Sequence, residues 1–176
     1  GRQARRLMED ARAAIAAAVA ARPADVVFCS GGTEANALAL TPGLRRGHGQ
    51  GAERLLVSAI EHASVLAGGR FAPASTATIK VNGSGLVDLD HLGALLAAGP
   101  PALVSVMSAN NETGAVQPIS EIAHVVHEAG GLLHVDAIQA FGKIPININL
   151  LHADLMTLSA HKIGGPKGVG AVVVAE

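Results

Sequence analysis

Short apolar runs alternate with helix-like segments along most of this 176-residue chain, and this alternation restricts the possible folds more than any other feature. Helices that connect parallel strands produce such an alternation, which is typical of α/β proteins. We therefore predict an α/β fold with three layers (α/β/α) and a mainly parallel sheet. The strands are expected at residues 26–29, 54–58, 77–81, 102–107, 132–135, 154–158 and 169–174.

The helices are predicted from helix-forming residues and from the residues at their ends. Asp88 is suited to cap the start of one helix, because its carboxylate can accept free backbone N–H groups. Pro118 in a first turn and Gly130 after a last turn mark another. The chain shows no repeat and no internal boundary, so we expect a single domain over residues 1–176. Helices are expected at residues 2–21, 34–40, 88–98 and 118–129.

Composition excludes several classes of protein. The formal net charge is −1 and basic residues form no long block, which argues against a nucleic-acid or anionic membrane partner. No apolar run approaches the ~20 residues that span a bilayer. Cys29 is the one cysteine, so an intrachain disulfide is impossible and a reducing, cytoplasmic location is expected. We expect Cys29 to be buried in the core.

Polar residues follow several of the predicted strands. In an open α/β sheet, ligands bind beyond the carboxyl ends of the strands. Each segment by itself could be ordinary loop chemistry: the Gly-rich turn at 30–33 could be a plain capped turn, and Asp136 could cap a helix. Taken together, in such an apolar chain, they favour a ligand site. The segments are SGGTEAN (30–36), AIEH (59–62), SANNETG (108–114), DAIQ (136–139) and SAHK (159–162).

The chemistry of four of these positions fits one cofactor. A lysine in a desolvated site, such as Lys162, has a lowered pKa and adds to carbonyls. Asp136 could pair with a protonated pyridine nitrogen, and the turn at 31–33 at a helix start could hold a phosphate. His62 could stack on an aromatic ring. These needs together define pyridoxal 5'-phosphate (PLP), an electron sink that requires an acidic partner on its ring nitrogen.

Long motifs then show a family resemblance over essentially the whole chain. In order they are SGGTEAN, EHASV, VSVMSANNETGAVQPI, HVDAIQAFGKIPI and DLMTLSAHKIGGPKGVGAVVV. Together they closely resemble the cysteine desulfurases, members of the class V aminotransferase group of fold-type I PLP enzymes. The run HKIGGPKGVG is similar to the branch that serves nitrogenase and general iron–sulfur cluster assembly.

The resemblance implies specific roles for residues of this chain. Lys162 and His62 would be catalytic: Lys162 would link to the cofactor and move protons, and His62 would stack on its ring and act in acid–base steps. Asp136 would pair with the pyridine nitrogen, and Gln139 with the ring hydroxyl. The phosphate would be held by Gly32, Thr33, Ser159 and His161. The implied cofactor-binding residues are Gly32, Thr33, His62, Asn111, Asp136, Gln139, Ser159, His161 and Lys162.

The reaction of this family removes sulfur from L-cysteine, leaving L-alanine and a persulfide on an enzyme cysteine. The sulfur then passes to an iron–sulfur scaffold or another acceptor protein, and the family is homodimeric. Its persulfide cysteine lies beyond the lysine segment, where this chain stops, and Cys29 is not its equivalent. We therefore expect a fragment covering most of the large domain, without the small domain and C-terminal part, and inactive alone.

Two other functions remain open at this point. One is a related enzyme of the same fold group, a selenocysteine lyase or an aminotransferase for a small amino acid. The other is an inactive folded subdomain.

The chain also departs from the family pattern at Gly164. This branch of the family commonly has tyrosine at that position, so glycine removes packing beside Lys162.

Three further histidines have ordinary explanations. His124 and His127 lie three residues apart, but no third ligand accompanies them, so no metal site is expected. His134 shares a strand face with Asp136 by alternation and is either a satisfied core histidine or a support for the site.

Overall fold

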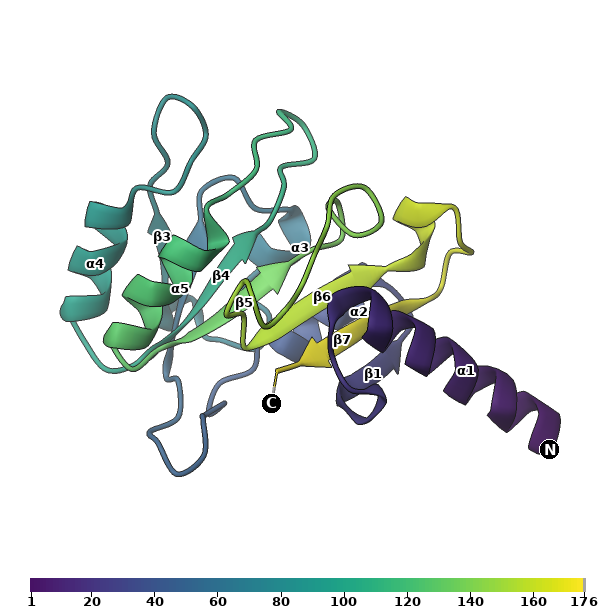
Figure 1. Cartoon of the computed structure of the whole chain (residues 1–176). Helices are drawn as coiled ribbons and strands as arrows, with labels where there is room; N and C mark the ends of the chain where they lie inside the picture. The colour runs from purple at the N-terminus through teal and green to yellow at the C-terminus, as the bar shows by residue number, and fades with distance from the viewer. Residues whose placement is uncertain (176) are drawn as a thin grey trace.

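The computed structural model describes residues 1–175, which form a seven-stranded sheet with helices on both faces (Figure 1). The sheet order is β1-β7-β6-β5-β4-β2-β3, and within residues 1–175 β7 runs opposite to the other six strands. The predicted three-layer α/β fold with a mainly parallel sheet is therefore confirmed. The strands are β1 (Val26–Cys29), β2 (Arg54–Ser58), β3 (Thr76–Ile79), β4 (Ala102–Met107), β5 (Leu132–Asp136), β6 (Leu155–Ser159) and β7 (Gly170–Val174).

The four predicted helices lie close to their expected positions, and the structure adds four short helical elements. Asp88 caps α4 as expected, since its side chain accepts the backbone N–H of His91. The one-turn helix α3 (Ala63–Leu66) and the 3₁₀ helix η3 (Ala160–Ile163) were not predicted. The other helices are α1 (Arg2–Val19), α2 (Gly32–Ala39), α4 (Leu89–Ala97), α5 (Ile119–Glu128), and the 3₁₀ turns η1 (Pro23–Asp25) and η2 (Pro73–Ser75).

One predicted strand is shorter than expected. The sequence predicts a strand at 77–81, but β3 ends at Ile79. Beyond it the chain turns back, and Val81 pairs with Val87 in an isolated antiparallel bridge. The backbone N–H of Lys80 is bonded to Nδ1 of His91 instead of to a neighbouring strand.

Two apolar clusters hold the layers together, one on each face of the sheet. The first joins α1, α4 and α5 to the sheet through residues such as Val19, Leu92 and Ile122. The second packs α2 and α3 on the other face, with Ala35 and Val65 among its buried residues. Neighbouring strand residues alternate between the clusters, as the two-residue period of a strand requires. This two-sided burial fixes the register of the strands and therefore the positions of their ends.

The N-terminal half of α1 extends beyond the sheet (Figure 1). Leu7 and Met8 there are 64% and 53% exposed, while Ala16 and Val19 near its end are buried. Across residues 1–175, the structure contains no helix that is both long and apolar enough to cross a membrane.

Candidate active site at the carboxyl edge of the sheet

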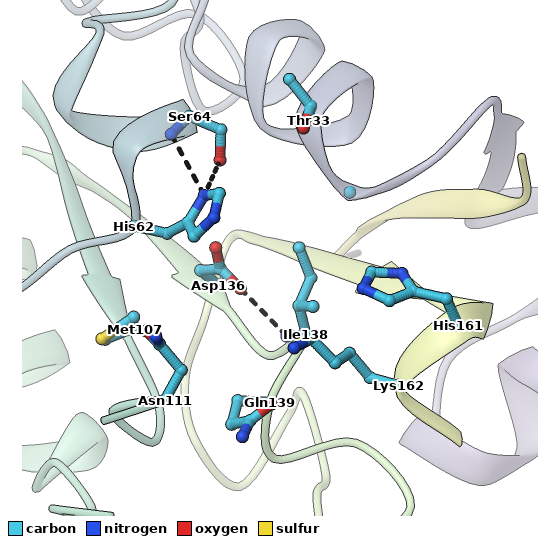
Figure 2. A pocket seen from close by; sticks show the side chains of 11 residues that line it. Thr33, His62, Ser64, Met107, Asn111, Asp136, Ile138, Gln139, His161 and Lys162 are labelled. Atoms are coloured by element: carbon cyan, nitrogen blue, oxygen red, sulfur yellow. Dashed lines mark hydrogen bonds between the residues drawn. The ribbon is translucent and has the colours of Figure 1, made fainter. Parts of the chain in front are cut away.

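A cavity of about 200 Å³ lies at the edge where β4, β5 and β6 end, beside the start of α2 (Figure 2). The parallel register brings these ends together, because Met107 pairs with Asp136 and Asp136 pairs with Thr157. Ligands of open α/β sheets bind at this edge. The cavity is lined by Gly32, Thr33, His62, Ser64, Met107, Asn111, Asp136, Ile138, Gln139, His161 and Lys162.

Eight of the nine predicted site residues are in this lining, and Ser159 is not. Ser159 is buried at the end of β6, where its Oγ lies 2.8 Å from Nδ1 of His161. A Cβ added at Gly32 would lie 3.4 Å from the Cβ of Ser159. Ser159 therefore lies behind Gly32 and holds the imidazole of His161, which itself faces the cavity.

The turn before α2 brings backbone close to the cavity. Gly31 has φ 150°, a conformation that side chains disfavour, and it precedes the first residue of α2, Gly32. A Cβ at Gly32 would come within 2.4 Å of Cδ1 of Ile138, so the absence of a side chain lets Ile138 pack directly against this turn. The turn is closed by Glu34, which accepts hydrogen bonds from the backbone and hydroxyl of Ser30 at 2.6 Å each.

Asp136 places a buried carboxylate at the base of the cavity. Its Oδ1 accepts the backbone N–H of Ile138 at 3.0 Å, and its Oδ2 accepts from the side-chain amide of Asn36 at 2.9 Å. Burial raises the pKa of Asp136, while these two hydrogen bonds and the nearby His62 oppose that rise. A cationic group on a ligand would further stabilise the ionised form.

His62 faces the cavity from the start of α3. Its Nδ1 accepts the backbone N–H of Ser64 at 3.1 Å and lies 2.8 Å from the Ser64 hydroxyl. Because Nδ1 accepts, the neutral ring carries its proton on Nε2. The side chain therefore caps the short helix and leaves Nε2–H for other partners (Figure 2).

Glu61, directly before His62, is buried with one oxygen satisfied. Its Oε1 accepts the Ser58 hydroxyl at 2.5 Å and the Met107 backbone N–H at 2.7 Å. Oε2 has no hydrogen-bond partner within the described part of the chain. Burial raises the pKa of Glu61 to about 8, and the charge of Asp136 adds to this rise.

Lys162 lies on η3, with His161, on the side of the cavity opposite His62 (Figure 2). The sequence predicts a desolvated position for this lysine at a strand end, and that prediction was wrong. The strand β6 ends at Ser159, and the 3₁₀ turn that follows carries Lys162 to the exposed rim. Gly164 ends this turn with φ 80°, which glycine adopts without strain.

Gln139 contributes a buried acceptor that lacks a partner. Its side-chain Oε1 has no hydrogen bond among residues 1–175, although the residue lines the cavity. Buried polar atoms are rarely left unpaired, so an unpaired atom here indicates a ligand hydroxyl or amine as its partner.

These features fit PLP. The cofactor has a cationic ring nitrogen for Asp136, a ring hydroxyl for Gln139 and an anionic tail for the close backbone at Gly32. Lys162 and His62 lie on opposite sides of the cavity (Figure 2).

Three lining residues were not singled out from the sequence: Ser64, Met107 and Ile138. Met107 ends an apolar strand, and Ile138 is an apolar residue between Asp136 and Gln139. The sequence therefore indicates a core position for each of them. Ser64 could have been suspected, because it follows His62 by two residues in a segment already considered functional.

The other residues considered from the sequence are not at this site. His124 lies 3.3 Å from Glu128, and His127 contacts Asp154 at 2.8 Å. Within the described residues, no group of three or more His, Cys, Asp or Glu side chains could hold a metal ion. Cys29 is only partly buried, which corrects the expectation of a core position.

Comparison with known proteins places the chain in a family. All of residues 1–176 match the family described as aminotransferase class-V. The chain belongs to the class-V aminotransferase family. Members of this family, including the cysteine desulfurases, depend in general on PLP.

The similar curated relatives of this class-V chain are cysteine desulfurases. One from Trichormus azollae is 42% identical over 178 residues, covering 99% of this chain and 44% of the relative. The cysteine desulfurase IscS of Dictyoglomus turgidum is 37% identical, covering 100% of this chain and 45% of that protein. The chain thus spans somewhat under half the length of these relatives.

Solved structures agree with this result. A NifS-like protein from Rickettsia africae superposes with a TM-score of 0.88 at 40% identity, covering 99% of this chain and 48% of that one. A structure of SspA in complex with cysteine gives a TM-score of 0.81 at 33% identity, covering 98% of this chain and 50% of that one.

Proposed function

We propose that this chain forms the PLP-binding part of a cysteine desulfurase, which removes sulfur from L-cysteine and yields L-alanine and a persulfide for iron–sulfur cluster assembly. The observation that carries the proposal is the meeting of Asp136, Gln139, His62 and Lys162 around one cavity beside Gly32. The likeness to cysteine desulfurases supports the same reaction.

Each residue would contribute a distinct function to cofactor binding. The backbone at Gly32 and the side chains of Thr33 and His161 would hold the phosphate, with Ser159 fixing the His161 ring. Asp136 would hold the proton of the ring nitrogen, and Gln139 would hydrogen-bond the ring hydroxyl group. Asn111, which lines the cavity, would lie beside the cofactor or the substrate carboxylate.

Lys162 and His62 would carry the proton transfers. When bound, PLP supplies an electron sink that stabilises negative charge on the substrate α-carbon. The Nζ of Lys162 would hold the cofactor and then take and return a proton at the substrate. His62 would stack on the ring, with Nε2 available as the acid–base atom because Nδ1 accepts from Ser64.

The substrate and partners rest on the relatives. L-cysteine is favoured over the substrates of a selenocysteine lyase or a small-amino-acid aminotransferase, because the similar curated relatives named above are cysteine desulfurases. Cys29 does not suit the persulfide step, since burial raises the pKa of its thiol. A sulfur-accepting scaffold protein and a homodimer remain parts of the proposal, as does the single PLP-binding large domain.

A cytoplasmic location also remains a proposal. The bacterial IscS relative fits it, while a relative from Candida maltosa is described as mitochondrial.

Absorption spectroscopy tests the cofactor and the lysine together. PLP is added to the wild-type chain, to Lys162→Ala and to the control Lys167→Ala, which removes an exposed lysine from the same glycine-rich turn. We expect a visible band that survives desalting in wild type and in the control and is lost in Lys162→Ala. An equal band in Lys162→Ala would show that Lys162 is the wrong lysine. Absence of a band in all three proteins would contradict cofactor binding by this chain.

A further inference from the structure

Behind the cavity, buried polar side chains form a continuous series of hydrogen bonds from the middle of the sheet to the site. The Ser105 hydroxyl lies 2.8 Å from Nδ1 of His134, and Nε2 of His134 lies 3.1 Å from the Thr157 hydroxyl. The Thr157 hydroxyl donates to Oδ1 of Asn36 at 2.7 Å. All four residues are 0% exposed. Strands β4, β5 and β6 and helix α2 each supply one member.

These hydrogen bonds have a single possible direction. Burial lowers the pKa of His134 to about 3, so its ring is neutral and has one N–H. The Thr157 hydroxyl has one hydrogen, which it gives to Asn36, so it must accept from Nε2–H of His134. Nδ1 of His134 is then an acceptor for the Ser105 hydroxyl. Every donor therefore points toward Asn36.

Asn36 joins this series to two residues of the site. Its side-chain nitrogen donates to Oδ2 of Asp136 and to the Ser64 hydroxyl, at 2.9 Å each. Having accepted from Asn36, the Ser64 hydroxyl gives its own hydrogen to Nδ1 of His62 at 2.8 Å. This orientation of the amide is favoured because, if the amide were turned, its oxygen would face the Asp136 carboxylate at hydrogen-bond distance.

We propose that Asn36 is a positioning residue of the active site, which holds Asp136 ready for a cationic ring nitrogen and fixes His62 as its Nε2–H tautomer, and that Thr157 and His134 set the orientation of its amide. The value of this arrangement for catalysis rests on the proposed PLP chemistry. The arrangement itself is a property of the chain and can be measured without cofactor.

The electrostatic consequence falls on Asp136. Burial raises its pKa, and the hydrogen bonds from Asn36 and from the Ile138 backbone are among the causes that lower it. The other titratable groups that act with it are His62, which lowers its pKa, and Glu61, whose own pKa Asp136 raises. Loss of the Asn36 donor would therefore favour protonation of Asp136, and a neutral carboxyl cannot pair with a pyridinium.

Thr157→Val and Thr157→Ser form a matched pair for the test. Valine keeps the shape of the side chain but removes the hydroxyl that orients Asn36, whereas serine restores that hydroxyl. In the cofactor-free chain, the titration of Asp136 is followed by carbon NMR of its carboxyl group. Thr157→Val leaves the buried Oδ1 of Asn36 without its donor, so the amide is held less firmly against Asp136. We expect this variant to raise the Asp136 pKa by up to about one pH unit, a part of the value of a hydrogen bond to a charged group, and Thr157→Ser to stay near wild type. A folded Thr157→Val with unchanged titration would overturn the proposal.

Nitrogen NMR of the wild-type imidazoles tests the direction of the series, whether or not Thr157→Val folds. We expect His134 and His62 to carry their protons on Nε2, with Nδ1 unprotonated. A proton on Nδ1 of His134 would reverse the series and overturn the proposal. These readouts need no PLP, so a chain with the expected tautomers but no cofactor band would contradict the proposed function and leave the role of Asn36 as an organiser of Asp136 and His62 in place.

Discussion

Oε1 of Glu61 accepts the backbone N–H of Met107 at 2.7 Å, and this bond ties the segment after β2 to the end of β4. The same oxygen accepts the Ser58 hydroxyl, so the carboxyl group links β2 and β4 next to the site. Glu61 precedes His62 in the chain and is bonded to Met107, and both of these residues line the cavity. A change in the protonation state of Glu61 therefore affects residues of the site. Burial holds it in the neutral form, with a pKa of about 8.

Glu61 therefore predicts a pH-dependent stability. Its pKa is about 8 in the folded chain against an ordinary value of 4.5, so between these pH values the folded state keeps a proton that the unfolded state has lost. Stability should then fall as pH rises through this window, by on the order of 1.4 kcal/mol per pH unit. Denaturant unfolding between pH 5 and pH 8 measures this slope.

Glu61→Gln supplies the matched comparison for that slope. The amide oxygen can still accept from Met107, but the side chain no longer ionises. We expect the variant to lose most of the slope and to be more stable than wild type near pH 8. Equal slopes in the two proteins would show that Glu61 is ionised when folded.

The close packing at Gly170 predicts that no side chain fits at this position, next to the turn that precedes α2. A Cβ there would lie 2.5 Å from the backbone carbon of Gly31, which cannot move without shifting the start of α2. Gly170→Ala should therefore lose about 1–3 kcal/mol of unfolding free energy. Gly93→Ala is the control, because a Cβ in the middle of α4 meets open space and alanine should gain about 0.5–1 kcal/mol there. Thermal unfolding compares them, and equal stabilities would contradict a clash at Gly170.

The strands and the residues at their ends could be predicted from the sequence because their signals are local. Apolar runs predicted β1, β2 and β4 with the bounds observed, since a buried strand needs a continuous apolar stretch. The antiparallel direction of β7 was also within reach. Only residues 160–169 separate β6 from β7, too few for the crossover helix that a parallel pair requires.

The site was predictable only where single residues carry the chemistry. Asp136, Gln139 and Lys162 follow strands closely, where the fold itself directs attention. Asn36 lies 100 residues from Asp136 and 121 from Thr157, and no local pattern indicates that a helix residue will contact these two strands. The exposure of Lys162 was missed because the 3₁₀ turn after β6 has no strong sequence signal.

The partly buried position of Cys29 predicts that its thiol reacts slowly with alkylating reagents. Its Sγ donates to the carbonyl of Gly31 at 3.3 Å, and burial raises its pKa, so little of the reactive thiolate forms near neutral pH. Iodoacetamide should label the folded chain more slowly than the urea-unfolded chain, and Cys29→Ala should retain PLP as wild type does. Mass spectrometry follows the labelling. Equal rates in the two states would show an accessible and unperturbed thiol.

Replacing Gly32 by alanine should weaken PLP binding more than it lowers the stability of the fold. A Cβ at this position would clash with the far end of the Ile138 side chain at 2.4 Å, which can rotate away, and would lie 3.4 Å from the Cβ of Ser159. Gly32→Ala should therefore cost about 1 kcal/mol of stability. The displaced Ile138 and the added methyl group would both occupy the space proposed for the phosphate, so the PLP dissociation constant should rise about tenfold or more, or ~1.4 kcal/mol. Gly83→Ala, where a Cβ meets open space away from the cavity, is the control. Equilibrium titration with PLP measures both variants, and equal affinities would place the phosphate away from Gly32.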